Sequence, residues 1–315
     1  MVSLGDAHIL GASPIDPRAQ RHPLSRGPSI PIWPHGDALA LDAAGPSHYS
    51  WAVIIDFHAH AFPDALAERA MRTLLGEHEN IHAYTDGRLS SLIASMDRSG
   101  IDAAVIASIA TKPEQFDKIL AWSATIATSR VIPFGSVHPR DPLAIERVAR
   151  LAAEGFRGIK LHPFYQDFYI DEEALFPIYE RVRECGLILL CHTGFDIAFP
   201  RIRRCDPVRI RRVAERFPGL RFVATHLGAW SDWDEVQRHL VGQPISMELS
   251  YSLGELPPER ARAIILGHPE DRVMFGSDSP WQDQQETRTR LKALDLGPAR
   301  ERAILGENAR RLLGI

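Results

Sequence analysis

The sequence has few cysteines and no long hydrophobic run. Its three cysteines, Cys185, Cys191 and Cys205, are odd in number and form no CxxC pair. We therefore expect neither a disulfide framework nor a thiolate zinc site, and a reducing, cytoplasmic setting. The longest apolar runs, such as 103–110 and 187–191, are too short to cross a bilayer, so we expect no membrane contact.

An excess of basic residues is also missing. The 315 residues include 36 Lys and Arg against 40 Asp and Glu, which gives a formal charge of −4. Nucleic-acid binding usually shows as a clustered basic excess, so we expect a small-molecule partner rather than a nucleic acid. Histidine, in contrast, is abundant, with 14 residues, and their positions along the chain decide what they do.

Residues 1–50 differ in composition from the rest of the chain. They carry seven prolines and no sustained apolar period. Such a segment buries too little surface to offset its chain entropy, so we expect a flexible N-terminal arm. Its histidines, to which we assign no role, are His8, His22, His35 and His48.

From residue 51 to residue 315, apolar runs of strand length alternate with amphipathic stretches. Nearly continuous Val, Ile, Leu and Phe content is typical of strands buried on both faces, as in parallel sheets. Eight strand–helix units in about 260 residues predict a (β/α)8 barrel, with a doubly wound sheet as the rival fold. The predicted strands are 53–57, 103–108, 131–136, 158–161, 187–191, 221–225, 245–249 and 273–276. The predicted helices include 89–99, 114–129, 142–154, 172–185, 207–217 and 259–266.

Metal-ligating side chains end four of the predicted strands. The first run ends in His58 and His60, which the alternation of side chains along a strand places on one side. The fifth run ends in His192, the sixth in His226 and the eighth in Asp278. The carboxyl ends of parallel strands meet at one mouth of a barrel. We therefore predict a metal site with nitrogen and oxygen ligands, with zinc as the first candidate.

The fourth run adds Lys160 and His162 to the same mouth. A buried, unpaired ammonium is costly. We expect Lys160 to pair with a carboxylate such as Asp56 or Glu248, to meet the substrate, to lose its proton, or to become a carbamate that bridges two metals. Both His162 and His138 precede a proline, and for both a hydrogen bond that fixes a loop is favoured over metal ligation.

These motifs resemble the amidohydrolase superfamily. They are most similar to its amidohydrolase-related branch, which also contains aminocarboxymuconate-semialdehyde decarboxylase and resorcylate-type decarboxylases. The likeness covers about residues 53–315, including a closing helical segment at 304–313. The matching motifs are HAH at 58–60, GIKLHP at 158–163, HTG at 192–194, HLG at 226–228 and FGSDSP at 275–280.

The resemblance implies a metal-dependent hydrolase type of (β/α)8 barrel, and a homodimer. His226 corresponds to a histidine that is catalytic in one-metal members and a ligand in two-metal members. Lys160 stands where two-metal members carry a carboxylated lysine, so a second metal depends on that modification. Ala229 replaces the second Gly that many relatives have after His-x-Gly. The implied metal ligands are His58, His60, His192 and Asp278.

The leading functional prediction is hydrolysis at the carbonyl carbon of a small amide, lactone or ester. The metal activates a water, Asp278 accepts its proton, and His226 hydrogen-bonds the developing oxyanion. Lys160 is the third catalytic candidate, as a contact to the substrate. A non-catalytic binding or scaffold protein is disfavoured, because such a chain would be free to lose at least one of the five ionisable positions.

The alternative is metal-dependent, non-oxidative decarboxylation of a small unsaturated or aromatic acid. The same metal binds the substrate's oxygens, and Asp278 or His226 handles the proton. A His-x-His pair on the first strand fits this alternative.

Loops beyond the strand ends carry candidate substrate contacts. A carboxylated substrate needs cations, and Arg201, Arg203 and Arg204 either bind it in bidentate pairs or form a solvated loop face. Aromatic residues after the strands predict flat apolar walls for a planar or cyclic substrate. They are Phe164, Tyr165, Phe168, Trp230 and Trp281.

Overall fold

The computed structural model describes residues 53–76 and 81–315. The predicted N-terminal arm, residues 1–50 with its four histidines, lies outside the described residues.

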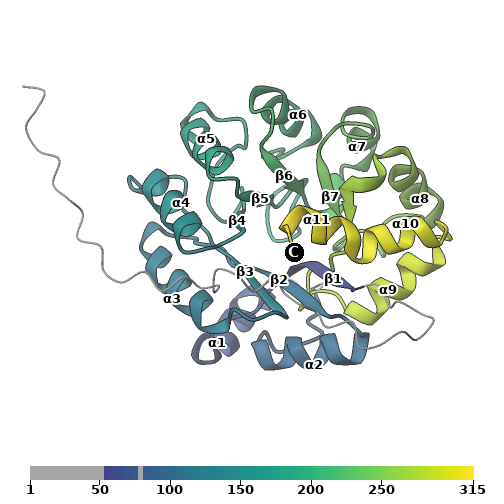
Figure 1. The fold of residues 1–315 in the computed structure, drawn as a ribbon, viewed down its shortest axis with the longest axis horizontal. Coiled ribbons are helices and arrows are strands. Elements are labelled where there is room, and N and C mark those ends of the chain that lie inside the picture. Colours follow the sequence, from purple (N-terminus) through teal and green to yellow (C-terminus); the bar gives the residue numbers. More distant parts are fainter. Residues whose placement is uncertain (1–52, 77–80) are drawn as a thin grey trace, which may run out of the picture. The chain divides into compact units, whose positions relative to one another are not determined.

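Eight parallel strands alternate with helices along the chain and form a (β/α)8 barrel (Figure 1). The strands are β1 (Ile55–Ala59), β2 (Ala103–Ala107), β3 (Val131–Phe134), β4 (Gly158–Leu161), β5 (Ile188–Cys191), β6 (Arg221–Ala224), β7 (Ser246–Glu248) and β8 (Val273–Met274). Hydrogen-bonded ladders run from β1 to β3 and from β4 to β8 in chain order. The amide of Gly135, after β3, donates to the carbonyl of Gly158 at 3.0 Å, and the amide of Phe57 donates to the carbonyl of Phe275 at 2.9 Å. These bonds join the two ladders at both seams, so the barrel is confirmed and the doubly wound alternative is wrong.

All eight predicted strands are present, with ends shifted by at most two residues. Six predicted helices are also present. They are α2 (Leu89–Ser99), α3 (Phe116–Ile126, after the 3-10 turn Pro113–Gln115), α4 (Ala144–Ala153), α5 (Phe176–Glu184, after the turn Glu173–Leu175), α6 (Pro207–Arg216) and α8 (Pro258–Gly267). The closing segment is also helical, with a π-helical stretch (Ala303–Glu307) that continues into α11 (Asn308–Leu313).

Four helices were not predicted from the sequence. They are α1 (Asp64–Leu75), α7 (Trp233–His239), α9 (Gln284–Ala293) and α10 (Pro298–Arg302). Helix α1 is an insertion, because α2 already makes the crossover from β1 to β2. Its sequence, DALAERAMRTLL, is rich in good helix formers, which was the available signal. No helix in the described part of the chain is both long and apolar enough to span a membrane.

An inner hydrophobic core fills the barrel below the strand ends. Side chains from alternate strand positions, among them Phe57, Phe134 and Leu190, meet Ala309 and Leu313 of α11 there. Arg157, just before β4, donates to the carbonyl of Leu313 at 2.7 Å, which places α11 at the amino-terminal end of the barrel. The carboxyl-terminal end is therefore the one available for a functional site.

Candidate active site

Strand β1 brings two histidines to the carboxyl-terminal mouth. The pairing register of β1 with β2 shifts between Asp56 and Ala59, and such a bulge re-aims side chains. Phe57 packs in the inner core, while His58 and His60 line a cavity above it. His58 and His60 therefore share one side, as predicted, and the irregular register lets the adjacent Phe57 and His58 both face the barrel interior.

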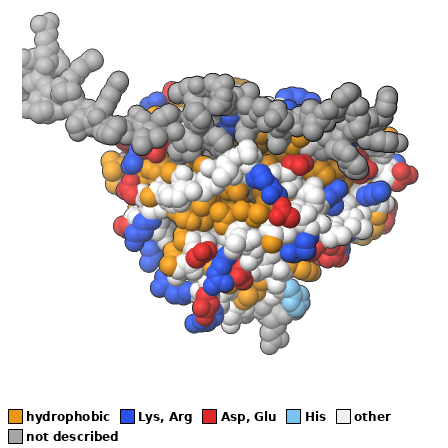
Figure 2. All heavy atoms as spheres, turned by 60° about the horizontal axis from the view of Figure 1, so that its bottom comes forward, with side chains coloured by type: hydrophobic (Ala, Val, Ile, Leu, Met, Phe, Trp, Pro, Cys, Tyr) orange, Lys and Arg blue, Asp and Glu red, His pale blue; other side chains and the backbone are white. Residues whose placement is uncertain are grey.

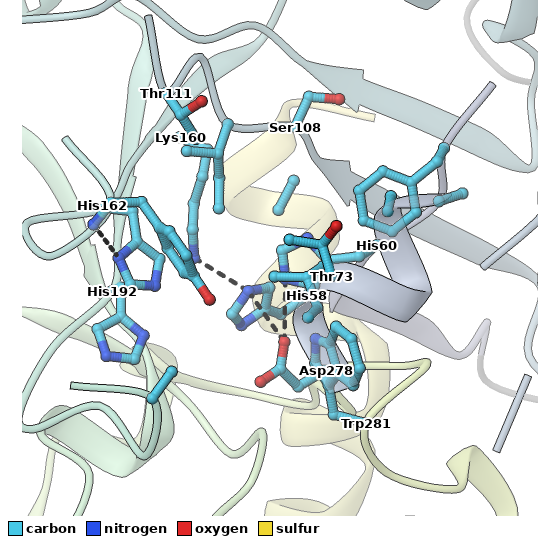
Figure 3. A pocket seen from close by; sticks show the side chains of 18 of the residues that line it. His58, His60, Thr73, Ser108, Thr111, Lys160, His162, His192, Asp278 and Trp281 are labelled. Carbon is cyan, nitrogen blue, oxygen red and sulfur yellow. Dashed lines mark hydrogen bonds and ion pairs between the residues drawn. The ribbon is translucent and has the colours of Figure 1, made fainter. Parts of the chain in front are cut away.

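Three metal-ligating atoms lie together at this mouth (Figure 3). Oδ1 of Asp278 lies 3.0 Å from Nε2 of His60 and 3.4 Å from Nε2 of His58. This oxygen is buried and has no hydrogen-bond partner in the described part of the chain. Burial alone would raise the pKa of Asp278, but its interactions with the neighbouring imidazoles of His58 and His60 lower it well below its usual range. An ionised oxygen without a hydrogen-bond donor, facing two imidazole nitrogens, fits a divalent cation.

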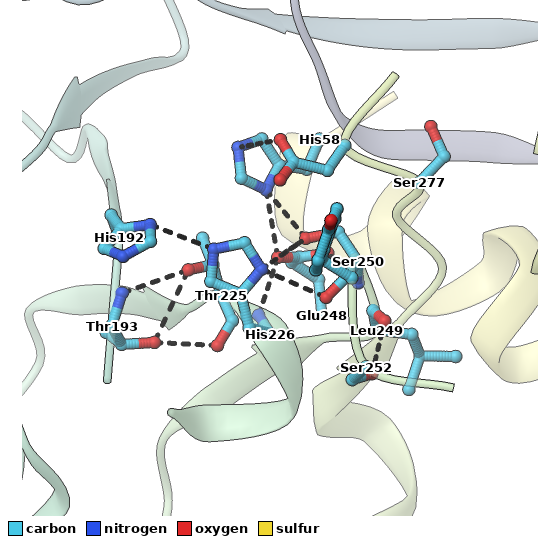
Figure 4. A network of polar contacts seen from close by, with 12 residues as sticks. His58, His192, Thr193, Thr225, His226, Glu248, Leu249, Ser250, Ser252 and Ser277 are labelled. Carbon is cyan, nitrogen blue, oxygen red and sulfur yellow. Dashed lines mark hydrogen bonds and ion pairs between the residues drawn. The ribbon is translucent and has the colours of Figure 1, made fainter. Parts of the chain in front are cut away.

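Glu248, at the end of β7, orients His58 (Figure 4). Its Oε1 accepts from Nδ1 of His58 at 3.1 Å, from the Ser250 hydroxyl at 2.7 Å and from the amide of His226 at 3.0 Å. A proton on Nδ1 leaves the Nε2 lone pair of His58 facing Asp278. A carboxylate behind a ligating histidine is the usual support for a metal ligand.

The loop that carries Asp278 is fixed against two neighbouring strands. The carboxylate of Asp56 accepts hydrogen bonds from the amide of Ser277, at 2.9 Å, and from its hydroxyl. A Cβ at Gly276 would lie 2.0 Å from Oε2 of Glu248. Only glycine therefore lets the chain pass this carboxylate, which explains the Gly in the FGSDSP motif.

Lys160 reaches the same cluster from β4 and is fully buried. Its Nζ lies 3.0 Å from Nε2 of His58. Of the alternatives for Lys160, the ion pair with Asp56 or Glu248 does not form among the described residues, where Asp56 binds Ser277 and Glu248 binds His58. Burial lowers the pKa of Lys160. Its amine is left next to the ligand atoms, in position to contact a substrate.

His192 and His226 face each other beside this cluster. Nδ1 of His192 lies 3.0 Å from Nε2 of His226. Their other ring nitrogens face carbonyl oxygens at 3.0 Å, those of Phe195 and Ser250. Burial lowers the pKa of both rings, to about 4 for His226, so each is neutral near pH 7. Each neutral ring then donates to its carbonyl, and the two remaining lone pairs point at each other, an arrangement that a cation satisfies.

A second histidine cluster surrounds Asp196, in the loop after β5. The rings of His162 and His192 stack with centroids 4.1 Å apart, at 16°. Oδ2 of Asp196 lies 3.3 Å from Nε2 of His162 and 3.6 Å from Nε2 of His192. Nearly parallel rings cannot aim their lone pairs at one point, so this cluster supports His192 rather than forming a metal site. Asp196 was not predicted from the sequence, where its only signal is its position four residues after His192.

The structure thus separates the four predicted ligands into a group of three and His192, which lies next to that group. His58, His60 and Asp278 have their ligand atoms within 4.8 Å of one another. His192 is not in this group and approaches it through His226, whose ring centroid lies 5.6 Å from that of His58.

The cluster lies in a cavity of about 720 Å³. Three of the five predicted aromatic wall residues line it, namely Tyr165, Trp230 and Trp281. Phe164 and Phe168 are buried and are not among the residues that line this cavity.

The three arginines predicted as possible carboxylate contacts, Arg201, Arg203 and Arg204, are not among the residues that line the cavity. Arg203 pairs with Asp232 at 2.9 Å, and Arg204 pairs with Asp167 at 2.8 Å. Neither guanidinium is directed to the metal-ligating cluster, so the structure gives no support for a substrate contact at these positions.

Fold and site together define a (β/α)8 barrel with metal-ligating side chains at its carboxyl-terminal mouth. The sequence model of the family described as Amidohydrolase matches residues 55–315. The chain belongs to the amidohydrolase family. This confirms the resemblance seen in its motifs and the prediction that it is an enzyme. No curated protein matches the sequence.

Several solved structures share the fold. 5-Carboxyvanillate decarboxylase from Sphingomonas paucimobilis is 16% identical, with a TM-score of 0.62 over 84% of this chain and 100% of that one. The enzyme of that name from Novosphingobium aromaticivorans, complexed with manganese and 4-hydroxy-3-methoxy-5-nitrobenzoic acid, is 20% identical, with a TM-score of 0.63 over 84% and 96%. 2,6-Dihydroxybenzoate decarboxylase from Rhizobium is 15% identical, with a TM-score of 0.61 over 84% and 99%. At these identities the likeness concerns the fold.

Proposed function

We propose that this protein is a metal-dependent, non-oxidative decarboxylase of an aromatic or unsaturated acid. The observation that carries the proposal is the group formed by His58, His60 and Asp278 at the mouth of a barrel whose solved neighbours include decarboxylases. The hydrolysis reaction, our leading prediction from the sequence, has no comparable support among these neighbours.

The proposed metal ligands are His58, His60 and Asp278, with His192 as the fourth. A divalent metal there supplies a Lewis acid that polarises the substrate's oxygen atoms. Zinc remains our proposed ion because the donors are imidazoles and one carboxylate. Manganese, the ion in the Novosphingobium structure, is the competing outcome of a metal analysis, and a second ion would require carboxylation of Lys160.

The side chains around the cluster suit a planar acid. Trp230 and Trp281 offer flat apolar surfaces to a ring, and Lys160 offers a donor to a substrate oxygen. Decarboxylation requires one proton at the carbon that carries the carboxylate. The C–C bond then breaks, its electron pair returns to the unsaturated system, and carbon dioxide leaves. We assign the handling of that proton to Asp278 or His226.

Carbon dioxide release tests this function directly. Protein reconstituted with zinc or manganese is incubated with a panel of hydroxybenzoates and unsaturated acids, and with lactones and amides. We expect carbon dioxide from at least one acid and no hydrolysis of lactones or amides. Hydrolysis without carbon dioxide would overturn the proposal in favour of the hydrolase prediction. Asp278→Asn and His226→Asn, each checked for metal content, are then assayed in deuterated water. The group that handles the proton is the one whose loss abolishes deuterium incorporation into the product.

A further inference from the structure

The cavity extends beyond the metal-ligating cluster into the space next to the inserted helix α1. Leu66, Ala70 and Leu74, spaced four residues apart, line the cavity together with Arg69. The other face of α1 carries the buried residues Ala67 and Met71. Helix α1 therefore has two apolar faces, of which one packs on the barrel and the other borders the cavity.

Helix α3 contributes a second wall to the same space. Lys118, Ile119 and Trp122 line the cavity at helical spacing, and α1 and α3 are neighbours in Figure 1. Leu66 is 47% exposed. Figure 2 turns the lower edge of Figure 1, where α1 and α2 lie, towards the viewer and shows hydrophobic side chains gathered there. The wall that α1 and α3 form is largely apolar, and it reaches the surface at Leu66.

Two exposed cations border this part of the cavity. Arg69 and Lys118 line the cavity, and neither forms an ion pair with another described residue. Their helix neighbours do, because Arg72 pairs with Glu68 at 2.5 Å and Asp117 pairs with Arg150 at 2.8 Å. Positive charge that no carboxylate of residues 53–76 and 81–315 pairs with, beside an apolar wall, is suited to an anionic group on a ligand.

We propose that the substrate is an extended dicarboxylic acid. Its first carboxylate belongs at the metal-ligating cluster, a ring-sized apolar portion lies between α1 and α3, and its second carboxylate is bound by Arg69 and Lys118. The cavity volume of about 720 Å³ falls in the range of about 300–1,000 Å³ that is typical for drug-sized ligands. The position of the substrate's first carboxylate rests on the proposed decarboxylase function. The positions of the apolar portion and the second carboxylate rest on the residues that line the outer cavity.

Binding of matched compounds tests the extension independently of catalysis. The probes are 2-hydroxybenzoate, 5-(4-carboxyphenyl)-2-hydroxybenzoate and the 4-carbamoylphenyl analogue, in which a neutral amide replaces the second carboxylate. Each is titrated calorimetrically into the metal-loaded full chain. We expect the dicarboxylate to bind about tenfold more tightly than the carboxamide, with each cation contributing a factor of about three. The preference should fall to about threefold in Arg69→Gln or Lys118→Gln and disappear in the double variant.

Matched variants distinguish the effect of the charges from the effect of the space in the cavity. Arg72→Gln, one turn along α1 and paired with Glu68, should keep the tenfold preference. Ala70→Trp, or Leu74→Trp if the first variant melts early, should weaken both extended compounds relative to 2-hydroxybenzoate.

The proposal is overturned if the wild type does not prefer the dicarboxylate, or if Arg72→Gln removes the preference as Arg69→Gln does. Absence of carbon dioxide release with the preference intact would count against the decarboxylase function alone. Decarboxylation of 2-hydroxybenzoate without any preference would count against the extension alone.

Discussion

Glu248 accepts a hydrogen bond from Nδ1 of His58 at 3.1 Å, and Nε2 of the same ring lies 3.4 Å from Oδ1 of Asp278. One imidazole therefore connects the end of β7 to the loop after β8. The carboxylate determines which nitrogen of His58 keeps its proton, and so which nitrogen is available as a ligand. The proposed metal affinity depends on this arrangement as much as on the ligands.

Glu248→Gln tests the arrangement, because it removes the charge behind His58 and keeps the size of the side chain. We expect the affinity for a divalent metal to fall about 10- to 100-fold, the usual cost of losing such a support. Competition with a fluorescent chelator measures this affinity. Glu255→Gln, at an exposed position, is the control. An unchanged affinity in Glu248→Gln would show that the His58 contact does not support a ligand.

Metal removal should lower the thermal stability of the protein. A metal at 100 times its dissociation constant stabilises the folded state by about 2.7 kcal/mol, which corresponds to about 5 to 10 °C in Tm for a domain of this size. Thermal melts with and without a chelator measure the shift. In Asp278→Ala the Tm shift should fall below half of the wild-type shift, because Oδ1, the buried oxygen without a hydrogen-bond donor among the described residues, is lost. An equal shift in this variant would place the metal elsewhere.

The strands and most of the candidate site were predictable from the sequence. Strands buried on both faces are continuous apolar runs, and each run leads directly to the residue it presents, as with His58, His192 and Asp278. Parallel strands in a barrel then bring these ends together whatever the intervening loops do. Glu248 also ends a predicted strand, but its pairing with His58 rather than Lys160 depends on side-chain directions that spacing does not specify.

The loops were not predictable in the same way. Asp196 approaches His192 through a turn with no periodic signal, and α1 follows a strand without being the crossover helix. Arg203 and Arg204 follow β5 in sequence, yet their guanidinium groups pair with Asp232 and Asp167. These partners are distant in sequence. The position of the arginines after a strand therefore did not predict where their guanidinium groups lie.

Substitutions of Trp230 and Arg203 should have different effects on KM. Trp230 lines the cavity, and Trp230→Leu should raise KM for an aromatic acid about threefold to tenfold by removing a ring contact. Arg203→Ala should leave KM and kcat unchanged, because this side chain is 55% exposed and paired with Asp232. Steady-state kinetics on the acid that releases carbon dioxide give both values. Equal increases in KM would restore Arg203 as a substrate contact.

His268 makes part of the stability of this fold dependent on pH. It is buried, and its Nε2 donates to the carbonyl of Ile245 at 2.7 Å. Burial lowers its pKa, and the charges of Arg300 and Arg272 act in the same direction. The unfolded chain therefore takes up a proton below pH 6.5 that the folded chain resists. The stabilisation is complete above about pH 6.5 and is lost as the pH falls towards the folded pKa, by at most about 1.4 kcal/mol per pH unit.

His268→Gln keeps a donor for Ile245 and removes the titration. Urea unfolding at pH 5.0 and 7.5 gives the free energy of unfolding of both proteins, and their difference cancels the contributions of the other histidines. We expect the wild type to exceed the variant by a larger margin at pH 7.5 than at pH 5.0. A margin that does not change with pH would mean that His268 has the same pKa in the folded and unfolded chains.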